Sequence, residues 1–511
     1  MWNLVSRLTG FLRVLAIGAA LGATFLGNTY QGANLVSNVL FELLAAGVLS
    51  SVLIPSFVRH VANGDRSAAT SLANAVLGIL IAALGTVVLV GLLSASWIMR
   101  LLTVAVESPA IRQQQLELGV FFLWFFLPQI LLYAIAAVAT GLLHADKRFS
   151  APAIAPVLNN LIVIATMMLF WAMRSGNPTL NLSLNQKLIL AVGTTFGVAA
   201  MAMVSLIAAW RSGFRLSPRW QPRHGELRTM AKKGLWAASY LGLTQVLLGV
   251  TLVLANRIEG GVVAYQIAFT FFLFPYALVG NPILTTLFPQ LSGDIQRNDQ
   301  TAFGQHLGSG IRQLSFFILP TSIFLAVLSN PILNAVSLGE LSAQSELVSR
   351  TLAGYAFGLF GYSVFQLLTR ASYAAEDTRS PTLINMAMAI IGSALMLWWS
   401  SSTDGINQVA SLGVAHSVVQ LAGAIVLMMV IAKKLPHSLD VALPIVRACG
   451  SSAVAGLAVW YLAETISLEG RFGAAFTVAM AGFVGVAIYA GIQFALGSPE
   501  VRRQKPQEAT V

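Results

Sequence analysis

Long apolar runs alternate with short polar segments along the whole chain. The runs are 18–28 residues long, and a helix needs about 20 apolar residues to cross a bilayer. The runs lack the strict alternation of barrel strands, so helices are the remaining way to satisfy the backbone in lipid. We predict 14 spanning helices, at 3–26, 32–57, 72–99, 118–143, 151–173, 187–210, 230–255, 261–290, 311–336, 350–369, 381–400, 407–432, 443–463 and 472–496. The expected fold class is therefore all-α, a polytopic membrane protein.

Composition agrees with this interpretation. Of the 511 residues, 57% are hydrophobic and 10% are charged, whereas soluble domains carry about 25% charged residues. The loops are too short for a soluble domain. The N-terminal run resembles a signal peptide, but Arg13 interrupts it and no cleavage site follows, so we expect the first spanning helix there. Cys449 is the only cysteine, which excludes a disulfide within the chain.

Positive charge is distributed unevenly between alternate loops. With the N-terminus in the cytoplasm, 23 of the 30 lysines and arginines fall on the cytoplasmic side and 7 on the outside. Cytoplasmic loops of membrane proteins carry the excess of lysine and arginine. We therefore expect both termini in the cytoplasm and an even number of spans.

Two motifs recur about 230 residues apart. Segments 145–152 and 375–381 each place an acid, a base, a serine and a proline in the same order, and Pro55 and Pro289 each end a span. An offset of six spans indicates a parallel repeat. We predict an N-terminal six-helix lobe at 1–225, a C-terminal six-helix lobe at 226–435, and two further helices with a short cytoplasmic tail at 436–511.

The polar residues within the spans are the candidate functional groups. Glu42 lies near the middle of span 32–57, and Asn34 and Asn38 share its helical face at four-residue spacing. A carboxylate at that depth costs about 2.5–3.5 kcal/mol, so it should face a wet cavity or a partner. The alternative is a hydrogen bond between helices that only stabilises the bundle.

The first span contains two arginines, Arg7 and Arg13. Arg13 and Glu42 come to similar depth, so the two side chains are candidates for an ion pair. That pair would be either structural or part of a transport cavity. Arg7 lies nearer the cytoplasm, where its side chain would alternatively extend to lipid phosphate.

Two further features have a functional and a structural interpretation. His416 in the twelfth span is a candidate for proton coupling, since histidine titrates near neutrality; the alternative is packing. The basic loop 211–233 spaces Arg211, Arg215, Arg219 and Arg223 four residues apart, with Trp220 among them. That spacing allows an amphipathic helix on anionic lipid; the alternative, which we favour, is a loop that only anchors the orientation of the chain.

Nothing in the sequence indicates catalysis. Neither a phosphate-binding GxxxxGK[ST] loop nor an HExxH motif is present, nor is there a Cys/His cluster of metal-binding spacing. We expect a protein that is not an enzyme and that has no cofactor or metal.

Several of these segments together resemble the MurJ/MviN family of lipid II flippases, which belongs to the superfamily of MATE exporters. The resemblance is collinear over nearly the whole chain. It is carried by Ser6–Arg13, Gly47 with Pro55, 141–156, 274–292 and 370–381. It implies 14 helices, two lobes in a V and a central cationic cavity, with Arg7 and Arg13 as cavity arginines. The family motif also begins unusually close to residue 1, so we expect the natural start upstream.

The chain departs from the family pattern inside that cavity. Phe41 and Glu42 stand where well-studied members have arginines, and Val14 and Asn28 replace family acids. The family's Asp-Arg-x-x-Glu in the eighth helix is Phe269–Leu273 here. These changes predict a divergent member with a less cationic cavity.

The expected function is a lipid II flippase of the bacterial cytoplasmic membrane that works by alternating access. The expected partners are the lipid-linked peptidoglycan precursor, membrane lipids and cell-wall synthesis proteins, with no nucleic acid. Substrate-binding candidates are Arg7, Arg13, Asn34, Asn38 and Glu42, and coupling candidates are Glu42 and His416. Two alternatives are an exporter of another glycolipid or of a cation, which Glu42 favours, and a non-transporting cell-wall scaffold.

Overall fold

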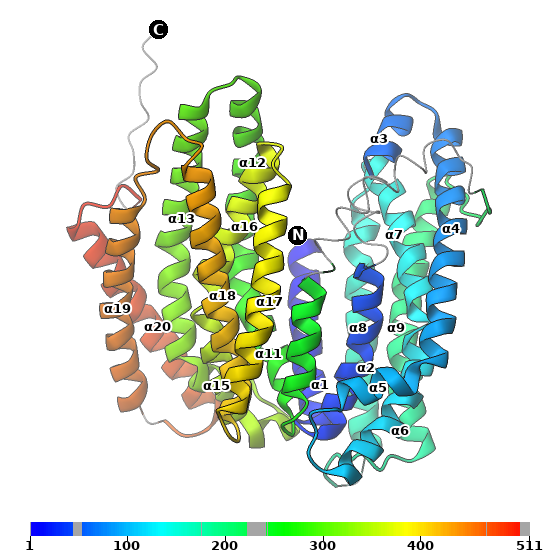
Figure 1. Ribbon diagram of the computed structural model, residues 1–511. Coiled ribbons are helices and arrows are strands. Elements are labelled where there is room, and N and C mark those ends of the chain that lie inside the picture. Colours follow the sequence, from blue (N-terminus) through cyan, green and yellow to red (C-terminus); the bar gives the residue numbers. More distant parts are fainter. Residues whose placement is uncertain are drawn as a thin grey trace. The chain divides into compact units, whose positions relative to one another are not determined.

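The protein is helical throughout the part of the chain that the computed structural model describes (Figure 1). The described residues are 2–43, 54–174, 176–221, 242, 244–466 and 468–500. Within them no strand is found, and the all-α prediction is confirmed.

The helices divide between two compact units. Unit 1 comprises Met1–Val263 and Leu338–Ala343, and unit 2 comprises Ala264–Ser337 and Gln344–Val511. The six-helix lobes inferred from the repeat remain a prediction.

The described residues of unit 1 form nine labelled helices and one further apolar helix. They are α1 (Trp2–Leu21), α2 (Phe25–Phe41), α3 (Ile54–Ala62), α4 (Arg66–Leu93), α5 (Ala95–Leu102), α6 (Pro109–Phe126), α7 (Gln129–Ala145), α8 (Ser150–Met173), α9 (Leu184–Arg211) and Thr244–Ala255. Local sequence explains several ends. Asp65 accepts a hydrogen bond from the Ala68 N–H at the start of α4, and Ser183 and Gln186 form a capping box at the start of α9.

Unit 2 contains α11 from Ala264 onward and the α- and π-helices that follow it. They are α11 (Gly261–Pro275), the π-helix η3 (Tyr276–Gly280), α12 (Asn281–Gln296), α13 (Gln300–Val327), α14 (Ser329–Val336), α15 (Ser345–Ala356), α16 (Leu359–Ala374), α17 (Arg379–Ser401), α18 (Asn407–Ala432), α19 (Ala442–Thr465) and α20 (Gly470–Ala495). The 3₁₀-helix η4 (Gly339–Gln344) lies between α14 and α15 in the chain. Pro275 lacks an N–H, and α11 gives way to η3 at that residue.

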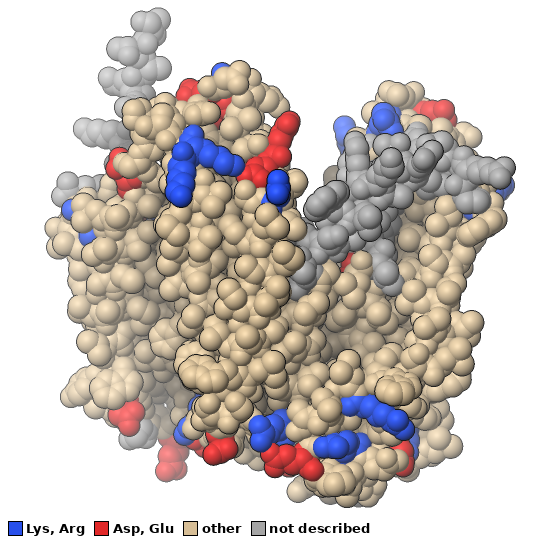
Figure 2. Space-filling model, in the orientation of Figure 1, with Lys and Arg blue, Asp and Glu red and all other residues tan. Residues whose placement is uncertain are grey.

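The described helices account for most of the predicted spans. Ten are long and apolar enough to cross a membrane, and a bent pair, Gly339–Ala356 with Leu359–Ala374, makes an eleventh. α1 accounts for residues 3–21 of the predicted span 3–26, and α2 begins at Phe25 within that span, whereas spans 32–57 and 230–255 include residues outside the described ranges. On the visible face of each unit, charged side chains gather toward the helix ends, and a largely uncharged band lies between (Figure 2). The protein is therefore a multi-pass membrane protein.

Small residues let α8 and α9 approach closely. Gly193 and Gly197 form a G-x-x-x-G motif on α9, a motif that permits close helix packing in membranes. A Cβ atom on Gly193 would meet the side chain of Thr166 at 2.4 Å, and one on Gly197 would meet the Asn159 Oδ1 at 2.5 Å. The glycines thus set the position of α8 and of its polar face.

The turns predicted to repeat share one backbone geometry. Lys147 and Glu376 both adopt φ 58°. The next residue, Arg148 or Asp377, donates its N–H to the carbonyl five residues earlier. The two acids differ in place, because Asp146 precedes the left-handed residue and Asp377 follows it. Other helix ends, such as that of α9 at Gly213, have the same turn geometry, so the repeat stays a prediction.

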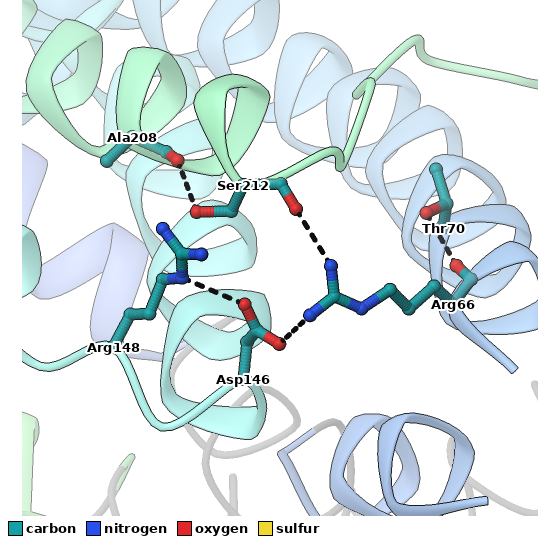
Figure 3. A network of polar contacts seen from close by, with 6 residues as sticks. All are labelled: Arg66, Thr70, Asp146, Arg148, Ala208 and Ser212. Atoms are coloured by element: carbon teal, nitrogen blue, oxygen red, sulfur yellow. Dashed lines mark hydrogen bonds and ion pairs between the residues drawn. The ribbon is translucent and has the colours of Figure 1, made fainter. Parts of the chain in front are cut away.

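A polar network joins three elements of unit 1 (Figure 3). Arg66, at the start of α4, donates to the Asp146 Oδ1 at 2.5 Å and to the Ser212 carbonyl at 3.3 Å. The Arg148 Nε lies 3.0 Å from the Asp146 Oδ2. The network fixes the turn between α7 and α8 against the ends of α4 and α9.

The amphipathic helix that the basic loop allowed is absent from residues 212–221, and the role of this loop as an orientation anchor stays a prediction. That segment is not helical, and Asn74 on α4 binds its backbone: the Ser217 N–H donates to the Asn74 Oδ1 at 2.7 Å. Gly213 at φ 89° follows the end of α9, and Pro218 removes an N–H that a helix would need. Residues 222–223 lie outside the described residues.

Candidate functional site

A polar cavity of about 160 Å³ lies inside unit 1. Its walls come from α1, α2, α7, α8 and α9. The lining residues are Arg13, Ile17, Tyr30, Asn34, Asn38, Tyr133, Asn159, Val163, Thr194, Val198 and Met201. Seven of these eleven are polar, although α7, α8 and α9 are otherwise strongly apolar.

Arg13 is the charged group of this cavity. It is half-buried on α1, and no acidic residue occurs among the described lining residues. Its Nε is buried and has no hydrogen-bond partner in the part of the chain that the structure describes. Arg13 lines the cavity together with the phenols of Tyr30 and Tyr133. The fold therefore leaves at least part of one guanidinium available to a ligand.

Tyr30 is held rigidly in the cavity wall. Its hydroxyl lies 2.6 Å from the Thr194 Oγ1, and the Thr194 hydroxyl donates to the Leu190 carbonyl at 2.6 Å. Because the threonine has one hydrogen and uses it on Leu190, Tyr30 must be the donor to Thr194. The Tyr30 ring packs edge-on against Phe122 and Phe126. Both phenol and threonine are thus fixed before any ligand enters.

Three asparagines add amide groups to the cavity. Asn34 and Asn38 lie one turn apart on α2, and the Asn38 Nδ2 donates to the Asn34 carbonyl at 3.4 Å. Asn159 projects from α8 beside Gly197, and its buried Oδ1 has no hydrogen-bond partner among the described residues. The sequence prediction that Arg13, Asn34 and Asn38 serve one site agrees with their common place here, although their role is a proposal.

Two of the predicted site residues, Glu42 and Arg7, are not among the described residues that line the Arg13 cavity. Glu42, at the end of α2, is exposed and accepts a hydrogen bond from the Gln245 Nε2 at 2.6 Å. It is not among the described lining residues, and the expected ion pair between Arg13 and Glu42 is not formed. A glutamine on a distant part of the sequence satisfies the carboxylate instead. Arg7 is exposed on α1 and is likewise not a described lining residue.

His416 lies in unit 2, on α18, and its ring is buried among aromatic side chains. Its ring centroid is 5.2 Å from that of Tyr355, 5.7 Å from Phe272 and 6.0 Å from Phe269. Its Nε2 has no hydrogen-bond partner among the described residues. This environment favours the packing interpretation of His416, and coupling through it remains a prediction.

Sequence reasoning missed four polar residues of the cavity: Tyr30, Tyr133, Asn159 and Thr194. The signal for Asn159 was present, since two adjacent asparagines interrupt the apolar span 151–173. Tyrosine and threonine are common in membrane helices, so Tyr30, Tyr133 and Thr194 carried no comparable signal.

The arrangement is suited to an anion that carries oxygen acceptors. A guanidinium binds phosphate oxygens in a planar fork. The Arg13 guanidinium shares this cavity with three asparagine amides and two tyrosine phenols. A cation would meet the charge of Arg13 and no carboxylate among the described lining residues. The polar wall on an apolar bundle would also hold the water that such an anion needs.

Comparison with known proteins assigns the chain to a family. The family model described as "Lipid II flippase MurJ" matches residues 17–480. A probable lipid II flippase MurJ of Rhizobium meliloti (strain 1021) is 28% identical over 420 residues, which cover 79% of this chain and 75% of the relative. The lipid II flippase MurJ of Burkholderia cenocepacia is 27% identical over 398 residues, covering 76% and 75%.

Solved structures agree at the level of the fold. A lipid II flippase MurJ in an inward closed conformation matches with a TM-score of 0.78 at 17% identity, covering 97% of this chain and 98% of that one. An inward-facing multidrug resistance MATE family transporter matches with a TM-score of 0.69 at 12% identity, covering 84% and 94%. The chain, a multi-pass protein of the bacterial cytoplasmic membrane, therefore belongs to the lipid II flippase MurJ family, a family of transporters.

Proposed function

We propose that this protein moves lipid II across the cytoplasmic membrane by alternating access, and that Arg13 binds the diphosphate of the lipid. The observation that carries the proposal is the Arg13 guanidinium, which lies in a polar cavity with a buried Nε that has no partner among the described residues. Family membership supplies the substrate. The divergence at Glu42 does not remove this arginine.

The chemistry of the substrate explains why one well-placed arginine matters. A diphosphate cannot cross hydrocarbon without compensation of its charge, because transfer of an isolated ion costs tens of kcal/mol. Arg13 would compensate part of that charge, and the amides of Asn34 and Asn38 would bind further oxygens. The prenyl tail would remain in the bilayer.

A second candidate function is export of a cation or of another glycolipid. Glu42 favours a cation, since its exposed carboxylate stands where family members carry arginines. The described cavity does not, because its only described charge is positive. We therefore place lipid II first. A scaffold that only binds cell-wall synthesis proteins would need no free guanidinium in a wet cavity.

We also propose that both termini are cytoplasmic, on the basis of the 23 to 7 distribution of lysine and arginine. Cysteines introduced at Asn177 and Ser342 should react with an impermeant thiol reagent from outside intact cells, and one at Asn298 should not. Cys449 is exposed and would first be replaced. Labelling at Asn298 would contradict both the orientation and the six-span repeat.

Energy coupling is a separate proposal with two candidate groups. Glu42 is the better one, since its carboxylate is exposed and oriented by Gln245. The Glu42→Gln protein should then fold normally and lose its response to an ion gradient, whereas His416→Phe should keep it. The opposite pattern would assign coupling to His416.

The proposal is tested by transport in reconstituted vesicles. A fluorescent lipid II analogue should cross vesicles that contain the wild-type protein, and Arg13→Ala should reduce the rate to that of empty vesicles. Arg13→Lys should retain part of the rate, because an ammonium lacks the planar fork. The matched control is Arg100→Ala, which removes an exposed arginine that lies over Trp97 outside the cavity. Full activity of Arg13→Ala would refute the proposed role.

A further inference from the structure

We propose that unit 2 carries a binding site for the headgroup of an anionic phospholipid between α13, α19 and the end of α20. A small open cavity lies there, apart from the Arg13 cavity of unit 1. Its principal lining residues are Arg312, Phe316, Arg447, Gln493, Ser498 and Glu500. The proposal does not depend on the transported substrate.

Two arginines converge on this cavity without a protein partner. Arg312 projects from α13 and Arg447 from α19, and both are half-buried. In the described part of the chain neither guanidinium has a hydrogen bond or an ion pair, although the Glu500 carboxylate lines the same cavity. With two positive charges and one negative, the site keeps a net positive charge. Two half-buried guanidinium groups are an unfavourable arrangement unless an anion lies between them.

Buried hydrogen bonds form a floor beneath the arginines. The Gln493 Nε2 donates to the Ser451 Oγ at 3.2 Å, and the Ser451 hydroxyl donates to the Arg447 carbonyl at 2.7 Å. The Ser498 hydroxyl donates to the Gln493 Oε1, which fixes the turn after α20. Both Gln493 and Ser498 are almost fully buried. The floor is therefore built by the fold and does not need a ligand to form.

The start of α19 adds to the attraction for an anion. Val441 precedes the helix and supplies no side-chain acceptor for its first N–H groups. Pro444 and Arg447, in the first two turns, both line the cavity. The positive end of the helix dipole thus reinforces the two arginines.

The surroundings identify the anion as a lipid headgroup. The cavity measures about 20 Å³, which is room for one oxygen-sized group, so most of a headgroup would stay at the mouth. Large apolar side chains that adjoin lining residues in the sequence are exposed: Leu443 and Val446 on α19, and Phe494 on α20. Acyl chains would cover these side chains, whereas a free phosphate ion would not. Basic pockets between membrane helices bind anionic headgroups in this way.

The test is lipid retention measured by native mass spectrometry on the full-length protein in detergent. Dioleoyl-phosphatidylglycerol should bind to the wild type and dioleoyl-phosphatidylcholine should not. The Arg312→Gln/Arg447→Gln protein should bind phosphatidylglycerol at least tenfold more weakly, since it loses two charge-assisted contacts. Glu500→Gln should bind it more tightly, because a competing carboxylate is removed. The matched control is Arg379→Gln, which removes an exposed arginine of α17 that is not among the described lining residues of the cavity. This variant should bind phosphatidylglycerol like the wild type.

Three results would overturn the proposal. One is equal retention of phosphatidylglycerol by the wild type and the double variant. Another is weaker retention by Glu500→Gln, a variant that leaves both arginines and the buried floor in place. The last is inorganic phosphate that displaces phosphatidylglycerol at equal concentration, which would show that the acyl chains contribute nothing and that the site takes any phosphate.

Discussion

Replacing Arg13 by methionine should stabilise the protein and abolish its transport. The Arg13 Nε is buried without a hydrogen-bond partner among the described residues, and a buried polar group left in this state costs about 1–3 kcal/mol. Methionine fills similar space with a flexible apolar chain. Because a polar cavity of about 160 Å³ has room for several water molecules at the rest of the guanidinium, we expect the lower end of that range, about 1 kcal/mol, as the gain in free energy of unfolding.

The assay is equilibrium unfolding in mixed detergent micelles, with transport measured on the same preparation. Arg100→Met is the matched control. Arg100 is exposed and its guanidinium lies 5.7 Å from the centre of the Trp97 ring, so its loss should change the free energy of unfolding by no more than about 0.5 kcal/mol. If Arg13→Met lowers the free energy of unfolding by more than 1 kcal/mol, protein groups hold Arg13, and a role in substrate binding loses its physical basis.

Three other substitutions test particular contacts. Gly197→Val should destabilise the protein by about 1–3 kcal/mol, because even a Cβ would meet the Asn159 Oδ1 at 2.5 Å; little change in thermal unfolding would show that α8 moves aside easily. Asp377→Asn should cost no more than about 1 kcal/mol. Burial opposes the ionised form of Asp377, but hydrogen bonds and the charge of Lys434 prevail and lower its pKa from 3.8 to about 2. The wild-type advantage should therefore be complete above pH 3.8 and disappear as the pH falls through 2; an advantage that persists at still lower pH would contradict this. Asn28→Leu should lower thermal stability by about 1–3 kcal/mol, since the buried Asn28 amide accepts from and donates to the backbone of the segment that leads into α11. Unchanged stability would mean that water replaces those bonds.

The helical fold class and most of the spans could be predicted because membrane helices are read from long apolar runs. The left-handed turns at Lys147 and Glu376 have a geometry that other helix ends share, so the repeat inferred from two short motifs stays a prediction. The helix interpretation of the basic segment after α9 was wrong for residues 212–221, because four-residue spacing of arginines describes a helix face only if the backbone is helical. There, Asn74 binds the backbone from another helix, and the sequence of the segment alone does not contain that information.

Part of the candidate site could also be predicted from the sequence. Arg13, Asn34 and Asn38 stand out because polar groups are costly in apolar spans. The similar depth of Arg13 and Glu42 in the membrane suggested that they form an ion pair. Depth does not fix the direction of a side chain, and Gln245 donates a hydrogen bond to Glu42 instead. Tyr30 and Thr194 become site residues only through their mutual hydrogen bond across 164 residues of chain.

Complementation tests the central claim most directly. The gene for this chain would be expressed in a bacterium whose own lipid II flippase can be depleted, beside Arg13→Ala at equal membrane abundance and Arg100→Ala as control. We predict that the wild type and Arg100→Ala restore growth and cell shape and that Arg13→Ala does not. Failure of the wild type to rescue, or full rescue by Arg13→Ala, would contradict the account of a lipid II flippase whose Arg13 binds the diphosphate.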